Sequence, residues 1–131
     1  GGWQLTLPVA TLPMDIATTF RIPLYPCRLT VHICERIDLS VAKAHKEPVE
    51  GKLEDNAALT TSGSGRFHVY FRPESISHGL IAHELFHITS GMLSHVGHKP
   101  IDGQNEAEAY LCGWLADRIY KFLNKRDILI K

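Results

Sequence analysis

Alternating apolar and polar residues predict a strand after residue 26. In "CRLTVHICE", residues 27–35, Leu29, Val31 and Ile33 alternate with polar or charged neighbours. Successive side chains of a strand point to opposite faces of the sheet, so the alternation places these three apolar side chains on one face. The pattern therefore predicts a half-buried strand.

A proline-rich segment precedes this strand. Residues 5–26 hold four of the seven prolines in the chain, and proline removes a backbone donor and breaks long regular elements. We expect residues 1–26 to form an irregular lead-in. Within it, "MDIATTF" between Pro13 and Pro23 could form a short helix.

A second alternating region, residues 56–73, predicts a β-hairpin. The runs "NAALTT" and "RFHVYFRP" flank the segment "SGSG", and glycine with serine between two alternating runs is typical of a tight turn. In the second run, Phe67, Val69 and Phe71 alternate with His68 and Tyr70. Both runs are therefore predicted to be strands.

Apolar residues recur at helical spacing in three further regions. These are residues 36–47 ("RIDLSVAKAHKE"), 74–91 ("ESISHGLIAHELFHITSG") and 105–123 ("NEAEAYLCGWLADRIYKFL"). Each is predicted to be a helix. In the middle region, Ser75 or Ser77 can cap the start and Gly91 can end the helix.

The order of these elements predicts an α+β fold. A small mixed sheet with a hairpin would pack on the helix of residues 74–91 and on a second, C-terminal helix. With 131 residues, the chain fits a single domain over residues 1–131.

The charge balance argues against some classes of partner. Lys and Arg number 14, as do Asp and Glu, and no basic run appears. The sequence therefore indicates neither a nucleic acid nor an anionic membrane as partner, and no apolar run reaches the length of a membrane span. We expect a soluble, cytoplasmic protein, and the sequence gives no oligomeric state. The odd number of cysteines favours reduced thiols, although a Cys27–Cys34 disulfide remains open.

Residues 83–87 read "HELFH", which we call the HELFH motif. On a helix, His83 and His87 lie one above the other, so both imidazoles can bind one ion, and Glu84 projects about 100° away. Zinc in catalytic sites prefers three nitrogen or oxygen ligands and one open position. The motif therefore predicts zinc bound by His83 and His87, with Glu84 as the base that takes a proton from water.

A third ligand must come from outside the motif. The extended motif of the metzincins requires glycine and histidine where this chain has Ser90 and Leu93. Glu106 and Glu108 in "NEAEAYL" are the alternatives, and they project about 160° apart from a helix, so only one can reach the ion. Periodicity favours Glu108, which lies nearer the apolar face.

The motif followed by "NEAEAYLCGWL" resembles the gluzincin branch of the zincin metallopeptidases. That resemblance covers roughly residues 56–122 and extends to small regulatory peptidases of phages and bacteria. It implies a zincin-like fold and Glu106 as the third zinc ligand. Many gluzincins have an acidic residue four positions later, where this chain has Tyr110.

The resemblance also implies a function. We expect zinc-dependent hydrolysis of a peptide bond in a specific regulatory protein or peptide, with Zn²⁺ as the cofactor. The substrate would extend the sheet edge formed by "RFHVYFRP" or, alternatively, by "NAALTT". The alternative function is a catalytically weak or inactive zincin-fold binding module of a phage or bacterial protein.

Overall fold

A computed structural model describes residues 14–46, 57–99, 101 and 103–131. The elements follow one another as β1 (Asp15–Arg21), β2 (Arg28–Cys34), α1 (Ile37–His45), β3 (Ala58–Gly63), β4 (Arg66–Phe71), α2 (His78–His95) and α3 (Glu106–Lys125). A single 3-10 turn over Pro73–Ser75 leads into α2. The predicted α+β class is confirmed.

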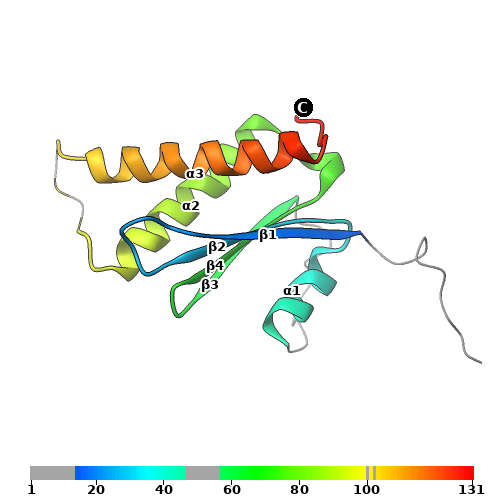
Figure 1. The fold of residues 1–131 in the computed structure, drawn as a ribbon, viewed down its shortest axis with the longest axis horizontal. Helices are drawn as coiled ribbons and strands as arrows, with labels where there is room; N and C mark the ends of the chain where they lie inside the picture. Colours follow the sequence, from blue (N-terminus) through cyan, green and yellow to red (C-terminus); the bar gives the residue numbers. More distant parts are fainter. Residues whose placement is uncertain (1–13, 47–56, 100, 102) are drawn as a thin grey trace, which may run out of the picture.

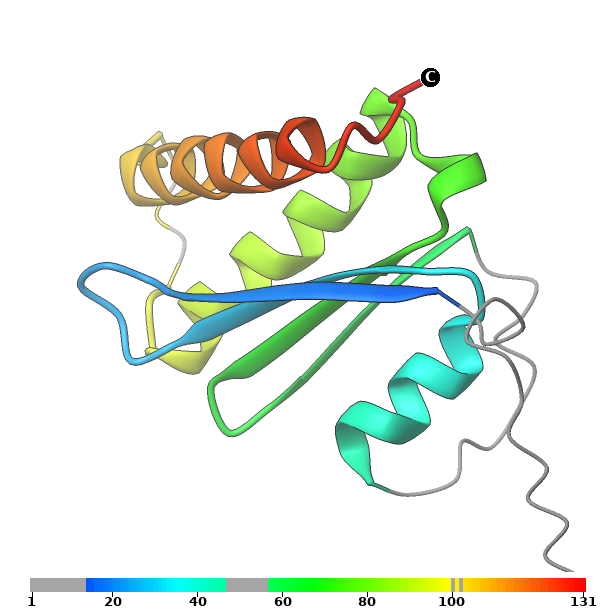
Figure 2. The same ribbon diagram turned by 45° about the vertical axis from the view of Figure 1, so that its right-hand side comes forward.

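The four strands form one mixed sheet in the order β1-β2-β4-β3. The outer pairs β1/β2 and β3/β4 are antiparallel, and the central pair β2/β4 is parallel. Helices α2 and α3 cover one face of the sheet, and α1 covers part of the other face (Figure 1). Figure 2 shows the same three layers from a second direction. The strand order makes β1 and β3 the two edges of the sheet.

The main core lies between the sheet and helices α2 and α3. Its buried members come from the inner faces of β2 and β4 and from the apolar sides of both helices. Val31 and Val69 are partners in the central parallel pair, and both are fully buried. Burial of this apolar surface is the main force that fixes α2 against the sheet.

A smaller core lies on the opposite face, under α1. Cys34, Ile37, Val41 and Tyr70 are buried there. The second half of β2 is consequently buried on both faces, so the prediction of a half-buried strand holds only for its first residues. All three cysteines are free thiols, so the Cys27–Cys34 disulfide does not form.

The expectation for the lead-in was wrong where the structure describes it. Residues 15–21 form strand β1 rather than a short helix, with alternating exposed and half-buried side chains along "DIATTFR". Isoleucine, the two threonines and phenylalanine favour extended backbone, and Pro23 follows the strand instead of interrupting it. Residues 1–13 of the predicted lead-in lie outside the described residues.

The predicted hairpin is confirmed, and its turn is short. Ser64 and Gly65 both have positive φ, 54° and 77°, between the paired residues Gly63 and Arg66. Positive φ at both central positions is the type I′ geometry, whose twist matches that of the two strands. Strand β4 pairs with β2 as well as with β3, which makes β4 central and β3 an edge, so "RFHVYFRP" as the sheet edge was wrong. The alternative, "NAALTT", provides the edge, although Asn56 lies outside the described residues.

The three predicted helices are all present. The hydroxyl of Ser77 accepts a hydrogen bond from the backbone N–H of Leu80 and caps α2, as one alternative predicted. Gly91 does not end the helix, which continues to His95. A Cβ at Gly91 would lie 2.8 Å from Cε1 of Phe67, so this glycine allows α2 to approach β4. Within the described residues, no helix combines the length and apolarity needed to cross a membrane.

Candidate metal centre

The HELFH motif lies in the middle of α2, and its two histidines are exposed. The Nε2 atoms of His83 and His87 are 3.2 Å apart, so one ring donates a hydrogen bond to the other. Two ligands at tetrahedral angles and about 2.0–2.1 Å from one zinc ion lie about 3.3 Å apart. The two imidazoles are therefore placed as two ligands of a single zinc ion would be.

Glu84 points into the molecule, toward the edge strand β3. Its side chain is buried, with 5 % exposure. Its Oε2 accepts a hydrogen bond of 2.5 Å from Oγ1 of Thr60. A short bond from a neutral hydroxyl to a carboxylate is a strong interaction that fixes the carboxylate in one orientation.

Thr60 is a residue of the site that the sequence analysis missed. The alternation in β3 puts Thr60 on the same side of the strand as Ala58 and Ser62, and this side faces α2. That signal existed in the sequence, but the pattern alone could not show which helix the strand faces. The pairing of β3 with β4 supplies the missing information.

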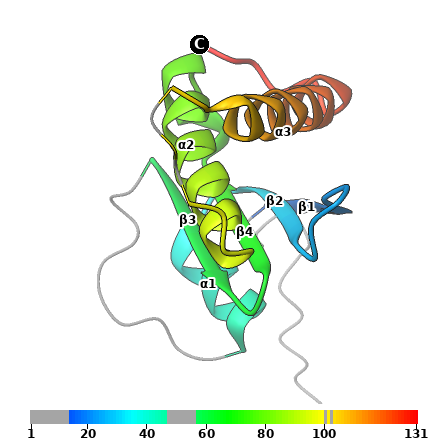
Figure 3. The same cartoon turned by 90° about the vertical axis from the view of Figure 1, so that its left-hand side faces the viewer.

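A groove separates β3 from α2. One cavity of about 420 Å³ is lined by Thr60, Ser62, His83, Glu84 and His87, among others. A second cavity of about 530 Å³ shares Ala58, His83 and Glu84 and continues toward the first turn of α2. In Figure 3, α2 runs alongside β3 and β4. The histidine pair therefore lies against a long groove whose opposite wall is the edge strand.

The backbone of β3 offers hydrogen-bonding groups along this groove. Residues that flank a two-residue hairpin turn form a hydrogen-bonded pair, and such pairs alternate along an antiparallel ladder. The register Gly63 to Arg66 therefore directs the backbone groups of Leu59 and Thr61 toward β4. Those of Ala58, Thr60 and Ser62 point to the open edge, since β4 is the one described strand that pairs with β3.

The structure does not bring a third ligand to the histidine pair. Glu106 is exposed in the first turn of α3. Glu108 is half-buried, and its Oε1 lies 3.1 Å from Nε2 of His98. In residues 14–46, 57–99, 101 and 103–131, no group of three or more His, Cys, Asp or Glu side chains is placed to hold a metal ion. The structure therefore joins His83, Glu84 and His87, but neither glutamate of α3.

The other histidines near α2 have partners of their own. Nδ1 of His78 lies 2.8 Å from the hydroxyl of Tyr120. His98 contacts Glu108, and Nε2 of His95 lies against the hairpin turn at Gly65. His78 and His95 are the two end residues of α2 and His98 follows the helix, and within the described residues none of them groups with the histidine pair.

A second cluster of titratable groups lies on the α1 side of the sheet. Nε2 of His32 is 3.0 Å from Nδ1 of His68, and Nδ1 of His32 is 3.5 Å from a carboxylate oxygen of Asp15. Burial lowers the pKa of His68 from 6.5 to about 4, and the neighbouring His32 and His45 contribute in the same direction. Burial also lowers the pKa of His32, against the opposing effect of Asp15. Both histidines are therefore neutral near pH 7.

No known protein family, curated protein or solved structure matches the chain. The zincin-like identity of the fold thus stays a prediction from the motif.

Proposed function

We propose that the protein is a zinc-dependent peptidase whose active site is the groove between β3 and α2. One observation carries this proposal. The Nε2 atoms of His83 and His87, 3.2 Å apart, share a groove with the buried carboxylate of Glu84 and with the open backbone edge of β3. A ligand pair, a base and a peptide-binding edge are three parts that metal-assisted peptide hydrolysis can use.

The donor set fits zinc in part. His83 and His87 supply two nitrogen ligands, and Glu106, by its resemblance to the gluzincin glutamate, is the proposed third ligand. To serve, the first turn of α3 must come closer to the groove than in this structure. The bound ion would polarise the scissile carbonyl and lower the pKa of water.

Glu84 moves the proton. Its carboxylate follows His83 directly in the sequence and lines the same groove, so it can accept a proton from the attacking water and give it to the leaving amine. The hydrogen bond from Thr60 occupies Oε2 and leaves Oε1 for this role. Thr60 therefore acts as a positioning residue.

The edge strand orients the substrate. An extended peptide can pair with the outward backbone groups of Ala58, Thr60 and Ser62, which would lay its scissile bond beside the histidine pair. Side pockets would set the sequence preference. By the resemblance to small regulatory peptidases, we infer that the substrate is one regulatory protein or peptide.

The competing function is a binding module that uses the same groove without hydrolysis. The separation of Glu106 and Glu108 from the histidine pair favours it. The burial and fixed orientation of Glu84 favour the peptidase, because a site that only binds zinc structurally requires no base beside its ligands. Hydrolysis assays separate the two.

The test compares the wild type with Glu84→Gln, both loaded with zinc, on a pooled library of quenched fluorescent peptides. The amide keeps the shape of the carboxylate and loses the base, so we expect a loss of about 100-fold or more in kcat/KM with unchanged zinc content. Glu74→Gln is the matched control, since this exposed glutamate lies outside the groove. Equal rates in the wild type and Glu84→Gln would overturn the proposal. If both proteins bind zinc and peptide but neither cleaves the peptide, the result supports the binding-module function.

A further inference from the structure

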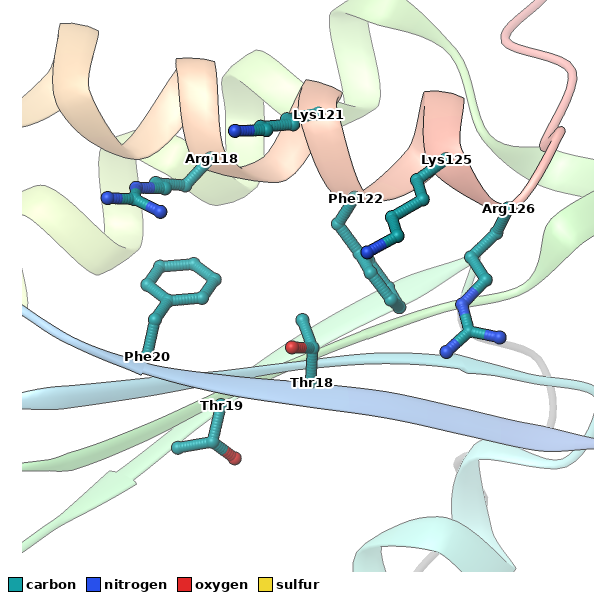
Figure 4. A pocket seen from close by; sticks show the side chains of 8 residues that line it. All are labelled: Thr18, Thr19, Phe20, Arg118, Lys121, Phe122, Lys125 and Arg126. Carbon is teal, nitrogen blue, oxygen red and sulfur yellow. The ribbon is translucent and has the colours of Figure 1, made fainter.

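A second groove lies at the other edge of the sheet, between β1 and the C-terminal half of α3. Its cavity measures about 320 Å³. Four cationic side chains from α3 and its end line the cavity, namely Arg118, Lys121, Lys125 and Arg126, and no acidic side chain does. Figure 4 shows Lys125 and Arg126 extending from the end of α3 toward β1. The groove is therefore strongly positive although the chain is neutral overall.

Within the described residues, none of the four cations forms an ion pair. Arg118, Lys121 and Lys125 are spaced by three and four residues, so they share one side of the helix and repel one another. The negative end of the helix dipole favours Lys125 and Arg126, but this effect fades within the last turn and does not account for Arg118. A bound anion would relieve the repulsion.

Two of the cations are held by aromatic rings. The guanidinium of Arg118 lies 5.0 Å from the ring centroid of Trp114, and that of Arg126 lies 5.9 Å from the centroid of Phe122. Cation–π contacts of this kind restrict the side chains before any ligand arrives. Thr18 on β1 points toward Phe122 and adds a hydroxyl to the facing wall of the groove (Figure 4).

The geometry points to a binding site for a small ligand that carries two or more phosphate groups. A guanidinium presents paired N–H donors that match phosphate oxygens. In Figure 4 the two arginines lie at opposite ends of the group of cations, with the lysines between them. The cavity is near the lower limit of small-molecule sites, about 300 Å³, so a compact ligand fits it. The site is at the opposite sheet edge from the HELFH motif and does not depend on the proposed peptidase activity.

A single-stranded nucleic acid fits this groove less well. Proteins that bind single strands stack bases on accessible aromatic faces. Here Phe20 packs edge-on against Trp114, with centroids 5.7 Å apart, and Phe122 is buried with 8 % exposure. An acidic peptide is the other competitor. Its carboxylates carry one charge each, whereas a diphosphate concentrates its charge within the span of the four cations.

Isothermal titration of the full chain with inorganic pyrophosphate, at about 50 mM salt, tests the inference. We expect saturable binding that weakens as salt is raised. Arg118→Gln and Lys125→Gln should each weaken it about tenfold, because each removes a charge-assisted hydrogen bond from an exposed position. The matched control is Lys43→Gln on α1, an exposed lysine on the opposite face of the sheet. His83→Ala is the second control, since pyrophosphate also binds metals, and it should leave the affinity unchanged.

A parallel titration with ATP identifies the source of the phosphates. Tighter binding of ATP than of pyrophosphate indicates a nucleotide, and equal or weaker binding indicates a free polyphosphate, so both results support the site. Absence of saturable pyrophosphate binding up to about 1 mM overturns the inference. Unchanged affinity in Arg118→Gln and Lys125→Gln, or tighter binding of a hexa-aspartate peptide than of pyrophosphate, overturns it equally.

Discussion

At each edge of the sheet, a groove separates the outer strand from a helix. The β3/α2 groove contains His83, Glu84 and His87, whereas the β1/α3 groove contains four cations and no carboxylate. The helix spacings differ accordingly. Positions i, i+1 and i+4 on α2 place two imidazoles together with a carboxylate to one side, whereas positions i, i+3 and i+7 on α3 align like charges on one side.

The two grooves share one architecture but present different chemical groups. Both grooves have an edge strand as one wall and a helix as the other, as Figure 4 shows for the β1/α3 groove. The side chains of the β3/α2 groove suit a metal cation, and those of the β1/α3 groove suit an anion. If the account is correct, substitutions in one groove should leave binding in the other groove unchanged.

The largest effect is expected from loss of a histidine ligand. His83→Ala and His87→Ala should each lower zinc affinity by more than about 100-fold, since even an outer contact to a ligand is worth about 10 to 100-fold. Arg118→Gln should leave zinc affinity unchanged. Zinc titration against a fluorescent chelator measures the zinc affinity of all three variants. Weaker zinc binding in Arg118→Gln would show that the two grooves are not independent.

Proline substitutions in β3 separate its open edge from its paired side. Thr61→Pro removes a donor that faces β4 and leaves its acceptor unpaired, so it should destabilise the fold by about 1–3 kcal/mol. Ser62→Pro removes a donor at the open edge, so it should lower peptide affinity and preserve zinc content. Urea unfolding and fluorescence anisotropy with a labelled peptide measure the two effects. Equal destabilisation by both prolines would contradict the assigned hydrogen-bonding pattern of β3.

A smaller effect is expected at Thr60. Thr60→Val keeps the shape of the side chain and removes the hydrogen bond to Glu84, so kcat/KM should fall about tenfold while KM changes little. Peptide hydrolysis assays that determine kcat and KM separately measure this effect. The adjacent Thr61→Val, which faces the other side of the sheet, is the control. No difference between the two variants would remove Thr60 from the site.

The sheet that joins the two grooves should lose stability in mild acid. In the folded protein, burial lowers the pKa of His68 from 6.5 to about 4. The unfolded chain therefore binds more protons between these values, and stability decreases as pH falls from about 6.5 toward 4. His68→Gln should reduce this dependence, as measured by the urea midpoint at pH 7.5 and pH 5. A dependence as steep as in the wild type would assign the effect to other groups, such as His32.

Periodicity in the sequence predicted most of the fold. The three helices, the hairpin and strand β2 follow from apolar spacing and turn residues, because burial on one face requires that spacing. Strand β1 was missed because prolines flank "DIATTFR" and suggested irregular structure. The order of the strands, which makes β3 an edge, depends on pairing between distant segments and has no local signal.

The candidate site was predictable only where its residues are neighbours in the sequence. His83, Glu84 and His87 lie within one helical turn, so their convergence follows from helix geometry. Thr60 comes from strand β3, which is distant from α2 in the sequence. The β1/α3 groove likewise joins residues of α3 with Thr18 of β1. The choice between Glu106 and Glu108 also depends on how α3 packs, which periodicity cannot determine.

Anomalous scattering measured on both sides of the zinc absorption edge, from crystals grown with zinc, tests the central claim most directly. The account predicts one peak in the β3/α2 groove, about 2.0–2.1 Å from Nε2 of both His83 and His87. A carboxylate of Glu106 at similar distance would complete the predicted ligand set. The absence of a peak at the histidine pair, or a single peak elsewhere, such as at His32 and His68, would contradict the account.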